Sequence, residues 1–512
     1  MSVVADKPAA AETHRVVSGD APSAARAAVI QTCTSGLRER LAVLRRARRA
    51  VAGDCDAVVE ACRLPWRRSD AETIQAEVLP LLSAMKWLER NAGRTLRDRR
   101  VGRRGRPAWL WGVTSVARRE PVGRVMIIAP ANYPLLLPGV QLVQAYAAGN
   151  RVAVKPAPGC RPVMDRFVAA LREAGMTDDA VEVLDEDPAE ATRRIDAGAV
   201  DKVFLTGSDR TGRAVMRQLA ERGIPSVMEL SGCDAMCVLP GADLDRVVRA
   251  IRFGLRLNAS QTCIAPRRVL VDRSLYEPLC RRVDEIVTGL APAAVSEAMR
   301  GRVRELADEA VRGGARVVAG GESDADEAGL LPRVLRDVSP DHGVAGEDTF
   351  APVVALIPCD GPAGIRRAYE RCGYRLGASV FGGDDAVAFA DRLDAGHVVV
   401  NDLIAPTADP RLPFPARGRS GFGATRGPEG LLEMTQVKAV IRRRGRMTPH
   451  LDDPHPDDEP LARALLAAGH APRLRDRLAA MKTLVSLGRA RYRSPGDAPP
   501  ADPSTPTQGP RS

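Results

Sequence analysis

The feature that most constrains the fold of this chain is an alternation of short apolar runs with longer amphipathic segments between residues 122 and 222. The apolar runs predict strands, which lie at residues 122–129, 151–155, 180–184 and 202–206. The amphipathic segments predict helices, at residues 136–148, 162–174, 188–197 and 212–222. Alternation of this kind is typical of an α/β fold, with a parallel sheet covered by helices on both faces.

A second α/β series runs from residue 242 to about residue 403. Its predicted strands include residues 268–271, 353–357 and 397–401. The first series follows two predicted helical regions, residues 38–62 and 71–94, and a predicted β-hairpin at residues 102–121. The chain is therefore expected to form two doubly wound, three-layer α/β domains and a small hairpin arm.

The composition argues against a nucleic-acid partner. The 512 residues carry a formal net charge of +11, yet only 6 of the 75 basic residues are lysines. The arginines are spread over the whole chain with acidic residues among them, and aromatic residues, which would stack on bases, make up only 4%. A general preference for arginine explains the charge at least as well as a basic binding surface does.

The cysteines and the apolar segments bear on the compartment. Ten cysteines in a chain of this length include no CxxC pair, so we expect neither a disulfide framework nor a metal site. Residues 125–149 carry no charge, but they include Pro130, Pro134 and Pro138, which a spanning helix would accommodate poorly. Residues 1–20 lack the apolar core of a secretion signal. These features predict a cytoplasmic protein without a membrane span.

Both ends of the chain have the composition of extensions. Residues 1–25 and 494–512 are expected to be disordered, and residues 448–460 are expected to be a linker. Residues 461–493 have helical periodicity. This segment is either a helix pair docked on the rest of the chain or, given its arginines, a contact for a partner or a membrane surface.

Four segments bring together residue types that carry chemistry. They are Pro-Ala-Asn-Tyr-Pro at 130–134, Met-Glu-Leu-Ser-Gly at 228–232, Asn-Ala-Ser-Gln-Thr-Cys at 258–263 and Glu-Asp-Thr-Phe-Ala-Pro at 347–352. Val-Lys-Pro at 154–156 and Phe-Leu-Thr-Gly-Ser at 204–208 lie between the first two. Each has an ordinary structural explanation when taken alone, since a single cysteine is more often a small buried apolar residue than a nucleophile.

Together the segments can support one reaction. A cysteine thiolate can attack an aldehyde carbonyl to form a thiohemiacetal, whose oxyanion needs fixed donors such as an asparagine amide and the cysteine's own N–H. Transfer of hydride to a nicotinamide leaves a thioester, and a carboxylate can activate water to hydrolyse it. Cysteine needs a local device that raises its thiolate fraction, and the sequence does not reveal one.

In the order and separation of these motifs the chain resembles the aldehyde dehydrogenase superfamily over roughly residues 30–440. The resemblance implies Cys263 as nucleophile, Glu229 as general base and Asn132 as oxyanion donor. It implies a cofactor, NAD or NADP, with Lys155 at the adenine ribose, and Gly207 and Ser208 at the pyrophosphate. The remaining implied cofactor contacts are Pro130, Ala131, Leu230, Gly212 at the start of a helix, and, at the nicotinamide ribose, Asp348 and Phe350.

The resemblance also implies a domain layout. Residues 26–105 and 121–231 would form the dinucleotide-binding domain, and residues 232–430 the catalytic domain. Residues 106–120 and 431–446 would form an oligomerisation arm, and residues 447–512 a linker, a helical extension and a tail. Such arms join edges between subunits, so a homodimer or homotetramer is expected.

Several positions depart from the family pattern. Ala131 replaces the usual tryptophan, Ser231 a glycine, Asp348 a glutamate, and Pro415-Ala416 a glycine pair. Pro158 stands where members that prefer NAD often carry a glutamate, and Arg161 follows three residues later. An arginine at this point could pair with a 2′-phosphate, so the sequence predicts that NADP is accepted, with or without NAD.

The second half-reaction and the substrate are less constrained. Glu229 favours hydrolysis to a free acid over transfer to coenzyme A, because relatives that acylate coenzyme A typically lack this carboxylate. A CoA-acylating or reductive dehydrogenase remains an alternative, as does a scaffold or binding protein on an impaired dehydrogenase fold, for which Ala131, Ser231 and Asp348 are the best support. The substrate is expected to be an aldehyde. Ala131 in place of tryptophan and the leucines at 135–137 suggest an apolar tunnel, but helix packing explains the same leucines equally well.

Overall fold

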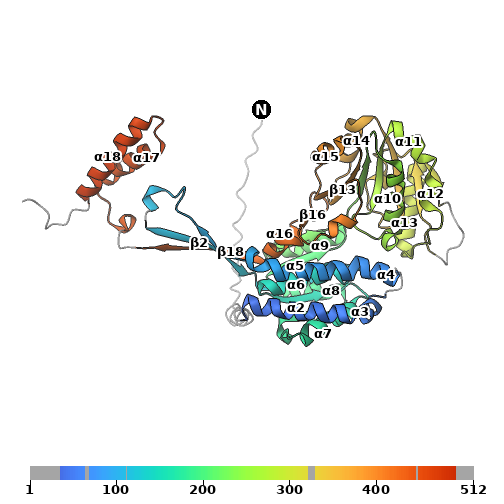
Figure 1. Ribbon diagram of the computed structural model, residues 1–512, viewed down its shortest axis with the longest axis horizontal. Helices are drawn as coiled ribbons and strands as arrows, with labels where there is room; N and C mark the ends of the chain where they lie inside the picture. The colour runs from blue at the N-terminus through green and yellow to red at the C-terminus, as the bar shows by residue number, and fades with distance from the viewer. Residues whose placement is uncertain (1–34, 64–68, 111, 321–328, 445–447, 492–512) are drawn as a thin grey trace, which may run out of the picture. The chain divides into compact units, whose positions relative to one another are not determined.

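The computed structural model describes residues 35–63, 69–110, 112–320, 329–444 and 448–491 (Figure 1). The termini predicted to be disordered, residues 1–25 and 494–512, lie outside these ranges. Contacts divide the described chain into two units. One comprises residues 35–97 and 119–437, and the other comprises residues 98–118 and 438–491.

The first α/β series forms a six-stranded sheet. Its strands are, in spatial order, β16 (Gly421–Phe422), β7 (Ser226–Glu229), β6 (Lys202–Thr206), β3 (Arg124–Ile128), β4 (Arg151–Lys155) and β5 (Val181–Val183). The five strands from β7 to β5 pair in parallel, and only β16 pairs antiparallel, with β7. The four predicted strands of this region and the parallel sheet are therefore confirmed, with ends that differ by two residues or fewer.

Helices cover both faces of this sheet because alternate residues of each strand point to opposite sides. Val125 and Ile127 of β3 pack into the core on one face, whereas Met126 packs into the core on the other. The helices of the first face are α2 (Leu37–Gly53), α3 (Cys55–Ala61), α5 (Leu79–Thr95), α6 (Leu136–Ala148) and α7 (Arg161–Glu173). Those of the second face are α8 (Pro188–Asp196) and α9 (Asp209–Glu221).

The two helical regions before the sheet are more broken than the sequence predicts. The helix expected over 38–62 is divided at Asp54, which has φ −114° and ψ 36° and follows Gly53, a weak helix former. The helix expected over 71–94 consists of α4 (Asp70–Thr73), a π-helical turn (Ile74–Val78) and α5. Pro80 lacks an N–H at the start of α5, and the wider turn lies directly before it.

The second α/β series forms a seven-stranded sheet. Its strands are, in spatial order, β10 (Arg316–Ala319), β11 (Arg333–Arg336), β12 (Val353–Cys359), β9 (Pro266–Asp272), β8 (Asp234–Val238), β13 (Gly377–Phe381) and β14 (His397–Val400). All neighbours pair in parallel except β10 and β11. The second predicted α/β domain is thus present as well, and three of its strands match the runs seen in the sequence.

This sheet too is covered on both faces by helices. One core contains residues from α13 (Glu297–Arg312), α14 (Gly361–Glu370) and α15 (Asp385–Ala390). The opposite core contains residues from α10 (Leu244–Arg256), α11 (Arg273–Cys280) and α12 (Val283–Val287). The unit of residues 35–97 and 119–437 also contains a two-stranded ribbon, β15 (Phe414–Pro415) with β17 (Ala424–Thr425), and the helix α16 (Gly427–Glu433).

The second unit contains the predicted hairpin and the C-terminal helices. Strands β1 (Arg99–Val101), β2 (Val113–Pro121) and β18 (Thr435–Arg443) form a three-stranded sheet, and β1 pairs antiparallel with β2. The helical periodicity after residue 461 corresponds to α17 (Asp458–His470) and α18 (Leu474–Arg491), which pack on each other. Among the described residues no helix is both long enough and apolar enough to span a membrane.

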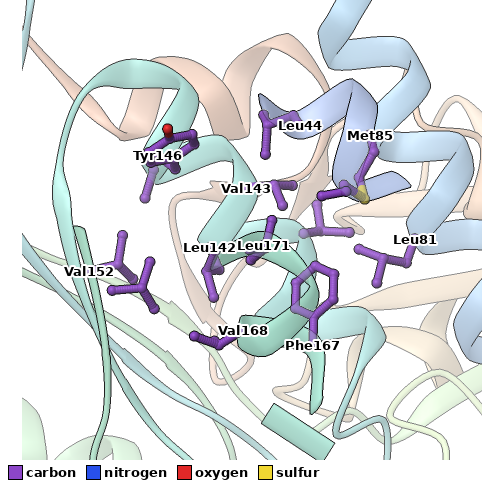
Figure 2. Packing of buried hydrophobic residues seen from close by; sticks show 14 of the residues in the cluster. Leu44, Leu81, Met85, Leu142, Val143, Tyr146, Val152, Phe167, Val168 and Leu171 are labelled. Carbon is purple, nitrogen blue, oxygen red and sulfur yellow. The ribbon is translucent and has the colours of Figure 1, made fainter. Parts of the chain in front are cut away.

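Figure 2 shows the core on the first face of the six-stranded sheet, where α6 and α7 pack against α2 and α5. Phe167 of α7 is 1% exposed, and Leu81 of α5 is fully buried. Both side chains lie against Gly139 of α6, where a Cβ would stand 3.2 Å from Leu81 and 3.5 Å from Phe167. The glycine therefore allows α6 to approach its neighbours closely.

Replacing Phe167 with alanine should lower the free energy of unfolding by about 3–5 kcal/mol, because the cavity cannot close between three packed helices. Urea titration followed by circular dichroism would measure the change. The matched control is Leu79→Ala at a side chain that is 52% exposed, which should change stability by less than about 0.5 kcal/mol. Equal effects of the two substitutions would contradict this assignment of the core.

Candidate active site

Cys263 lies at the end of a loop with unusual backbone geometry. The loop follows α10, and Asn258, Ala259 and Ser260 have φ of 49°, 51° and 62°. Residues with a Cβ occupy this left-handed region at a cost of about 1–3 kcal/mol each. Three in succession require tertiary contacts that hold the loop in place.

Arg267 supplies many of these contacts. Its Nη1 donates to the Ser260 hydroxyl at 2.8 Å, and its Nη2 donates to the Ser260 carbonyl at 2.8 Å. Nη1 also donates to the carbonyl of Ala351 at 3.0 Å, and Nε donates to Asp348 Oδ1 at 3.1 Å. The Arg267 side chain is 1% exposed and the Asp348 side chain 4%. One buried ion pair therefore joins the cysteine loop to the predicted segment at 347–352.

Asn132 reaches the cysteine loop from the six-stranded sheet. Its Nδ2 donates to the Gln261 carbonyl at 3.1 Å, two residues before Cys263. Asn258 Nδ2 donates in return to the Asn132 carbonyl at 3.1 Å, and the Tyr133 and Thr262 hydroxyls hydrogen-bond at 2.7 Å. The first and third predicted segments thus meet through three hydrogen bonds.

A buried carboxylate fixes the segment that carries Asn132. Glu77, in the π-helical turn, accepts from the N–H groups of Leu135 at 3.1 Å and Leu136 at 2.6 Å. These N–H groups belong to the start of α6, where no preceding turn can satisfy them. Glu77 therefore caps α6 and orients the turn at residues 132–134.

Glu229 ends β7 and approaches the same loop. It is 3% exposed, and its Oε2 accepts from the Thr425 hydroxyl at 2.9 Å. Three residues later, a Cβ on Gly232 would stand 2.4 Å from the Cys263 carbonyl oxygen. No other residue type allows so close an approach, and this glycine places the 228–232 segment against the nucleophile loop.

Burial raises the pKa of both central groups. The pKa of the Cys263 thiol is raised by burial and then by the nearby carboxylates of Glu229 and Asp234. Burial also raises the pKa of Glu229, while Arg426 and the Thr425 hydroxyl lower it. Arg426 likewise lowers the pKa of Cys263. Its charge therefore favours the ionised form of the nucleophile and of the base alike.

Arg426 is held beside the cysteine by Phe414. Its guanidinium carbon stands 4.7 Å from the centre of the Phe414 ring, and Phe414 belongs to the apolar cluster against which Cys263 packs. Its Nη1 donates to the Thr407 carbonyl at 3.2 Å, and its buried Nε has no hydrogen-bond partner among the described residues. A cation with a spare donor thus lies near the reactive centre.

Several of the predicted cofactor residues lie at the carboxyl edge of the six-stranded sheet. Lys155 ends β4, and Ala131, after β3, packs with Ala157 and Cys160. The Gly207 N–H, after β6, donates to the Glu229 carbonyl at 3.0 Å. Parallel sheets bind their ligands at this edge. Lys155 is 5% exposed, and no hydrogen bond to its ammonium group is seen within the described residues, so a donor is available for the hydroxyls of a ribose.

The helix expected to begin near Gly212 begins earlier. In the structure α9 starts at Asp209, because the Ser208 hydroxyl accepts from the Thr211 N–H at 3.1 Å and caps it. Gly207 and Ser208 therefore lie directly at a helix N-terminus, which suits a pyrophosphate. Gly212 is buried inside the first turns, where a Cβ would stand 2.4 Å from Leu230. This contact explains the glycine by packing, and the contacts of Gly212 and Leu230 with a cofactor stay predictions.

The two departures at Ser231 and Asp348 lie together. The pKa of Asp348 is raised by burial and lowered by Arg267, the Phe350 N–H and the Ser231 hydroxyl. Phe350, which has φ 47°, donates its N–H to Asp348 Oδ1 at 2.9 Å. The Ser231 hydroxyl thus lies near the shorter carboxylate, and the bond from Phe350 holds the 348–350 turn in place. The contact of Asp348 and Phe350 with a ribose stays a prediction.

Four residues of this site were missed in the sequence: Glu77, Arg267, Thr425 and Arg426. Arg267 carries the one usable signal, since arginines at 267 and 268 interrupt an otherwise apolar strand and a buried charge needs a partner. Thr425 and Arg426 lie more than 160 residues after Cys263, and only the pairing of β15 with β17 and of β16 with β7 brings them to it.

Replacing Arg426 with methionine should slow alkylation of Cys263 by iodoacetamide at neutral pH. Losing the positive charge raises the pKa of the thiol, so the thiolate fraction falls at every pH below that pKa. A charge effect of ~1 kcal/mol corresponds to about a fivefold slower reaction. Mass spectrometry of the Cys263 peptide would give the rate, with Arg417→Met at an exposed arginine as control. An unchanged rate would mean that Arg426 does not act on the thiol.

Comparison with known proteins places the chain in one family. Residues 6–440 match the aldehyde dehydrogenase family. The chain is 30% identical to 4,4'-diapolycopene aldehyde oxidase of a Methylomonas species, covering 80% of this chain and 78% of that protein. It is 30% identical to vanillin dehydrogenase of Pseudomonas fluorescens, covering 66% and 73%. A solved structure of Mycobacterium tuberculosis aldehyde dehydrogenase with NAD+ matches with a TM-score of 0.75 and 26% identity, over 83% of this chain and 91% of that one. The chain belongs to the aldehyde dehydrogenase family.

Proposed function

We propose that this aldehyde dehydrogenase oxidises an aldehyde to a carboxylic acid with NAD or NADP. One observation carries the proposal: Asn132, Glu229 and Cys263, which belong to different elements, converge on one loop. The residues at the sheet edge fit a dinucleotide, since Lys155 keeps its donors and Gly207–Ser208 precede a helix N-terminus. When bound, the nicotinamide accepts the hydride.

Each residue of the site has a defined task. The Cys263 thiolate attacks the aldehyde carbon, and the carbonyl oxygen takes the negative charge. An N–H of Asn132 and the N–H of Cys263 donate to that oxygen, and collapse of the thiohemiacetal with loss of hydride leaves a thioester on Cys263. Glu229 then accepts a proton from water, the hydroxide adds to the thioester, and the thiolate leaves as the acid forms.

Glu229 supports release by water over transfer to coenzyme A. Burial raises the pKa of this carboxyl, so its ionised form is a stronger base toward water than an exposed glutamate would be. The CoA-acylating or reductive alternative requires no such base. The scaffold alternative leaves the spare donors of Lys155 and Arg426 without a purpose.

The names of the relatives bear on the class of aldehyde. The two relatives named above carry the names of a polyene aldehyde and an aromatic aldehyde. We therefore propose an aromatic or long-chain apolar aldehyde as the substrate.

Assembly and location belong to the same proposal. We propose a homodimer or homotetramer that uses the arm at residues 106–120 and 431–446. Val437 and Ile441 of β18 are 58% and 69% exposed, which supports a partner for this strand. A cytoplasmic location agrees with the free cysteines of the described chain. The domain boundaries predicted at residues 231 and 430 are part of the same proposal.

Two substitutions test the reaction. Cys263→Ala should abolish reduction of NAD and NADP by aldehydes. Glu229→Gln should keep one rapid turnover of reduced cofactor and then slow the steady state by about 10²–10⁴-fold, because thioester hydrolysis loses its base. Stopped-flow absorbance would resolve the burst, and mass spectrometry would detect the acyl group on Cys263. Turnover that requires coenzyme A would favour the acylating alternative, and activity in Cys263→Ala would refute the mechanism.

Replacing Thr425 with valine should shift the acid limb of the pH–rate profile for thioester hydrolysis to higher pH. The Thr425 hydroxyl stabilises the ionised form of Glu229, so its loss raises the pKa of this carboxyl further, and a higher pH is then needed to ionise it. Acylating Cys263 with p-nitrophenyl acetate and following release of acetate against pH isolates this step. Thr435→Val, whose hydroxyl bonds the Leu432 carbonyl instead, should leave the limb in place.

A further inference from the structure

The first turn of α7 is a second helix N-terminus at the predicted cofactor edge. It begins at Arg161, directly after the loop that follows β4 and Lys155. Its N-cap residue is Cys160, which makes no side-chain capping bond. The first N–H groups of a helix attract anions, so an uncapped terminus here would suit the 2′-phosphate of NADP.

In this chain a carboxylate from a different strand already occupies that terminus. Glu186 Oε2 accepts from the Gly159 N–H at 3.0 Å, and its Oε1 accepts from the Arg161 N–H at 2.5 Å. Glu186 follows β5, which pairs in parallel with β4, so the two strands end side by side. A carboxylate thus lies beside Pro158, the position where the sequence lacks one.

The arginine expected to bind a 2′-phosphate is engaged elsewhere. Arg161 Nε donates to Asp165 at 3.2 Å, and its Nη1 donates to the Leu184 carbonyl at 3.4 Å. Turning the side chain toward a ligand would break both contacts. Arg161 therefore adds little attraction for a phosphate at this point.

The acidic character extends beyond Glu186. Asp185 and Asp187 flank it, and all three carboxylates lie close enough to Lys155 to act on the charge of its ammonium group. Asp187 itself caps α8 through the Ala189 N–H at 3.0 Å. The ammonium of Lys155 thus lies near three negative charges, and no hydrogen bond to it is seen within the described residues.

We infer that Glu186 makes this enzyme prefer NAD over NADP, an inference that rests on the proposed cofactor site. Each oxygen of the Glu186 carboxylate takes one N–H and keeps a second lone pair, so it can still accept from a ribose hydroxyl. A 2′-phosphate would instead meet the three carboxylates and find the helix N–H groups already used. Like charges brought together in this way oppose binding strongly.

Calorimetric titration with adenosine nucleotides tests this without any turnover. The wild-type protein should bind 5′-AMP at least about tenfold more tightly than adenosine 2′,5′-bisphosphate. Glu186→Gln should reduce this ratio by about tenfold or more, chiefly by tightening the bisphosphate. The matched control is Glu182→Gln, at an exposed glutamate of β5 that pairs with Arg194, and it should leave the ratio unchanged.

The remaining outcomes distinguish failure of the role of Glu186 from failure of the proposed cofactor site. Equal or tighter binding of the bisphosphate by the wild-type protein would overturn the role of Glu186 and leave the dehydrogenase intact. Failure of both nucleotides to bind would overturn the cofactor site itself and the inference with it. Asp185→Asn provides a second variant that leaves the cap of α7 in place, and its ratio should move in the same direction as that of Glu186→Gln, by a smaller factor.

Discussion

The buried ion pair of Arg267 and Asp348 is the constraint on which the active site depends. Burying either charge alone would be costly, and removing one partner of such a pair typically destabilises a protein by about 3–5 kcal/mol. Here the guanidinium also binds the Ser260 hydroxyl and carbonyl and the Ala351 carbonyl. The same side chain thus offsets its own burial and holds the left-handed backbone before Cys263. The conformation of the loop before Cys263 and the neutralisation of the buried Asp348 therefore both depend on Arg267.

Around this pair the site balances several buried charges. Glu229, Asp234 and Asp348 are buried carboxylates, and burial raises the pKa of each. They also raise the pKa of the Cys263 thiol, which opposes its ionisation. Arg426 acts against them, and it directly follows the ribbon strand that ends at Thr425, the threonine that bonds Glu229. The nucleophile and the base are therefore tuned by neighbours on a single short segment.

Much of the fold could be predicted because it depends on local patterns. Apolar runs with helices between them are enough to indicate parallel sheets with two covered faces, and β4, β6 and α6 match the predicted ranges at both ends. The errors lie where tertiary contacts override periodicity. The helix over 38–62 breaks at Asp54, a π-helical turn interrupts 71–94, and the Ser208 cap begins α9 three residues before Gly212.

The departures from the family pattern become interpretable only in three dimensions. Ser231 and Asp348, each weak evidence for a decayed enzyme, lie near each other, and the Ser231 hydroxyl lowers the pKa of the shorter carboxylate. In the cofactor proposal, Glu186 supplies the carboxylate that Pro158 lacks. It is 28 residues away in the chain and belongs to the loop after the neighbouring strand.

The sequence by itself indicated the α/β class and the order of the elements through its apolar periodicity. Its resemblance to a family, carried by the order and separation of several motifs, predicted Cys263, Glu229 and Asn132 as the central residues. Only the tertiary structure decided which groups surround them. Glu77 caps α6, Arg267 binds the cysteine loop, and Thr425 and Arg426 lie beside Glu229. Glu186, from the loop after β5, accepts from N–H groups at the start of α7. Electrostatic interactions act through space over several ångströms. Residues far apart in the sequence therefore shift the pKa of Cys263 and Glu229, and the sequence does not show which residues these are.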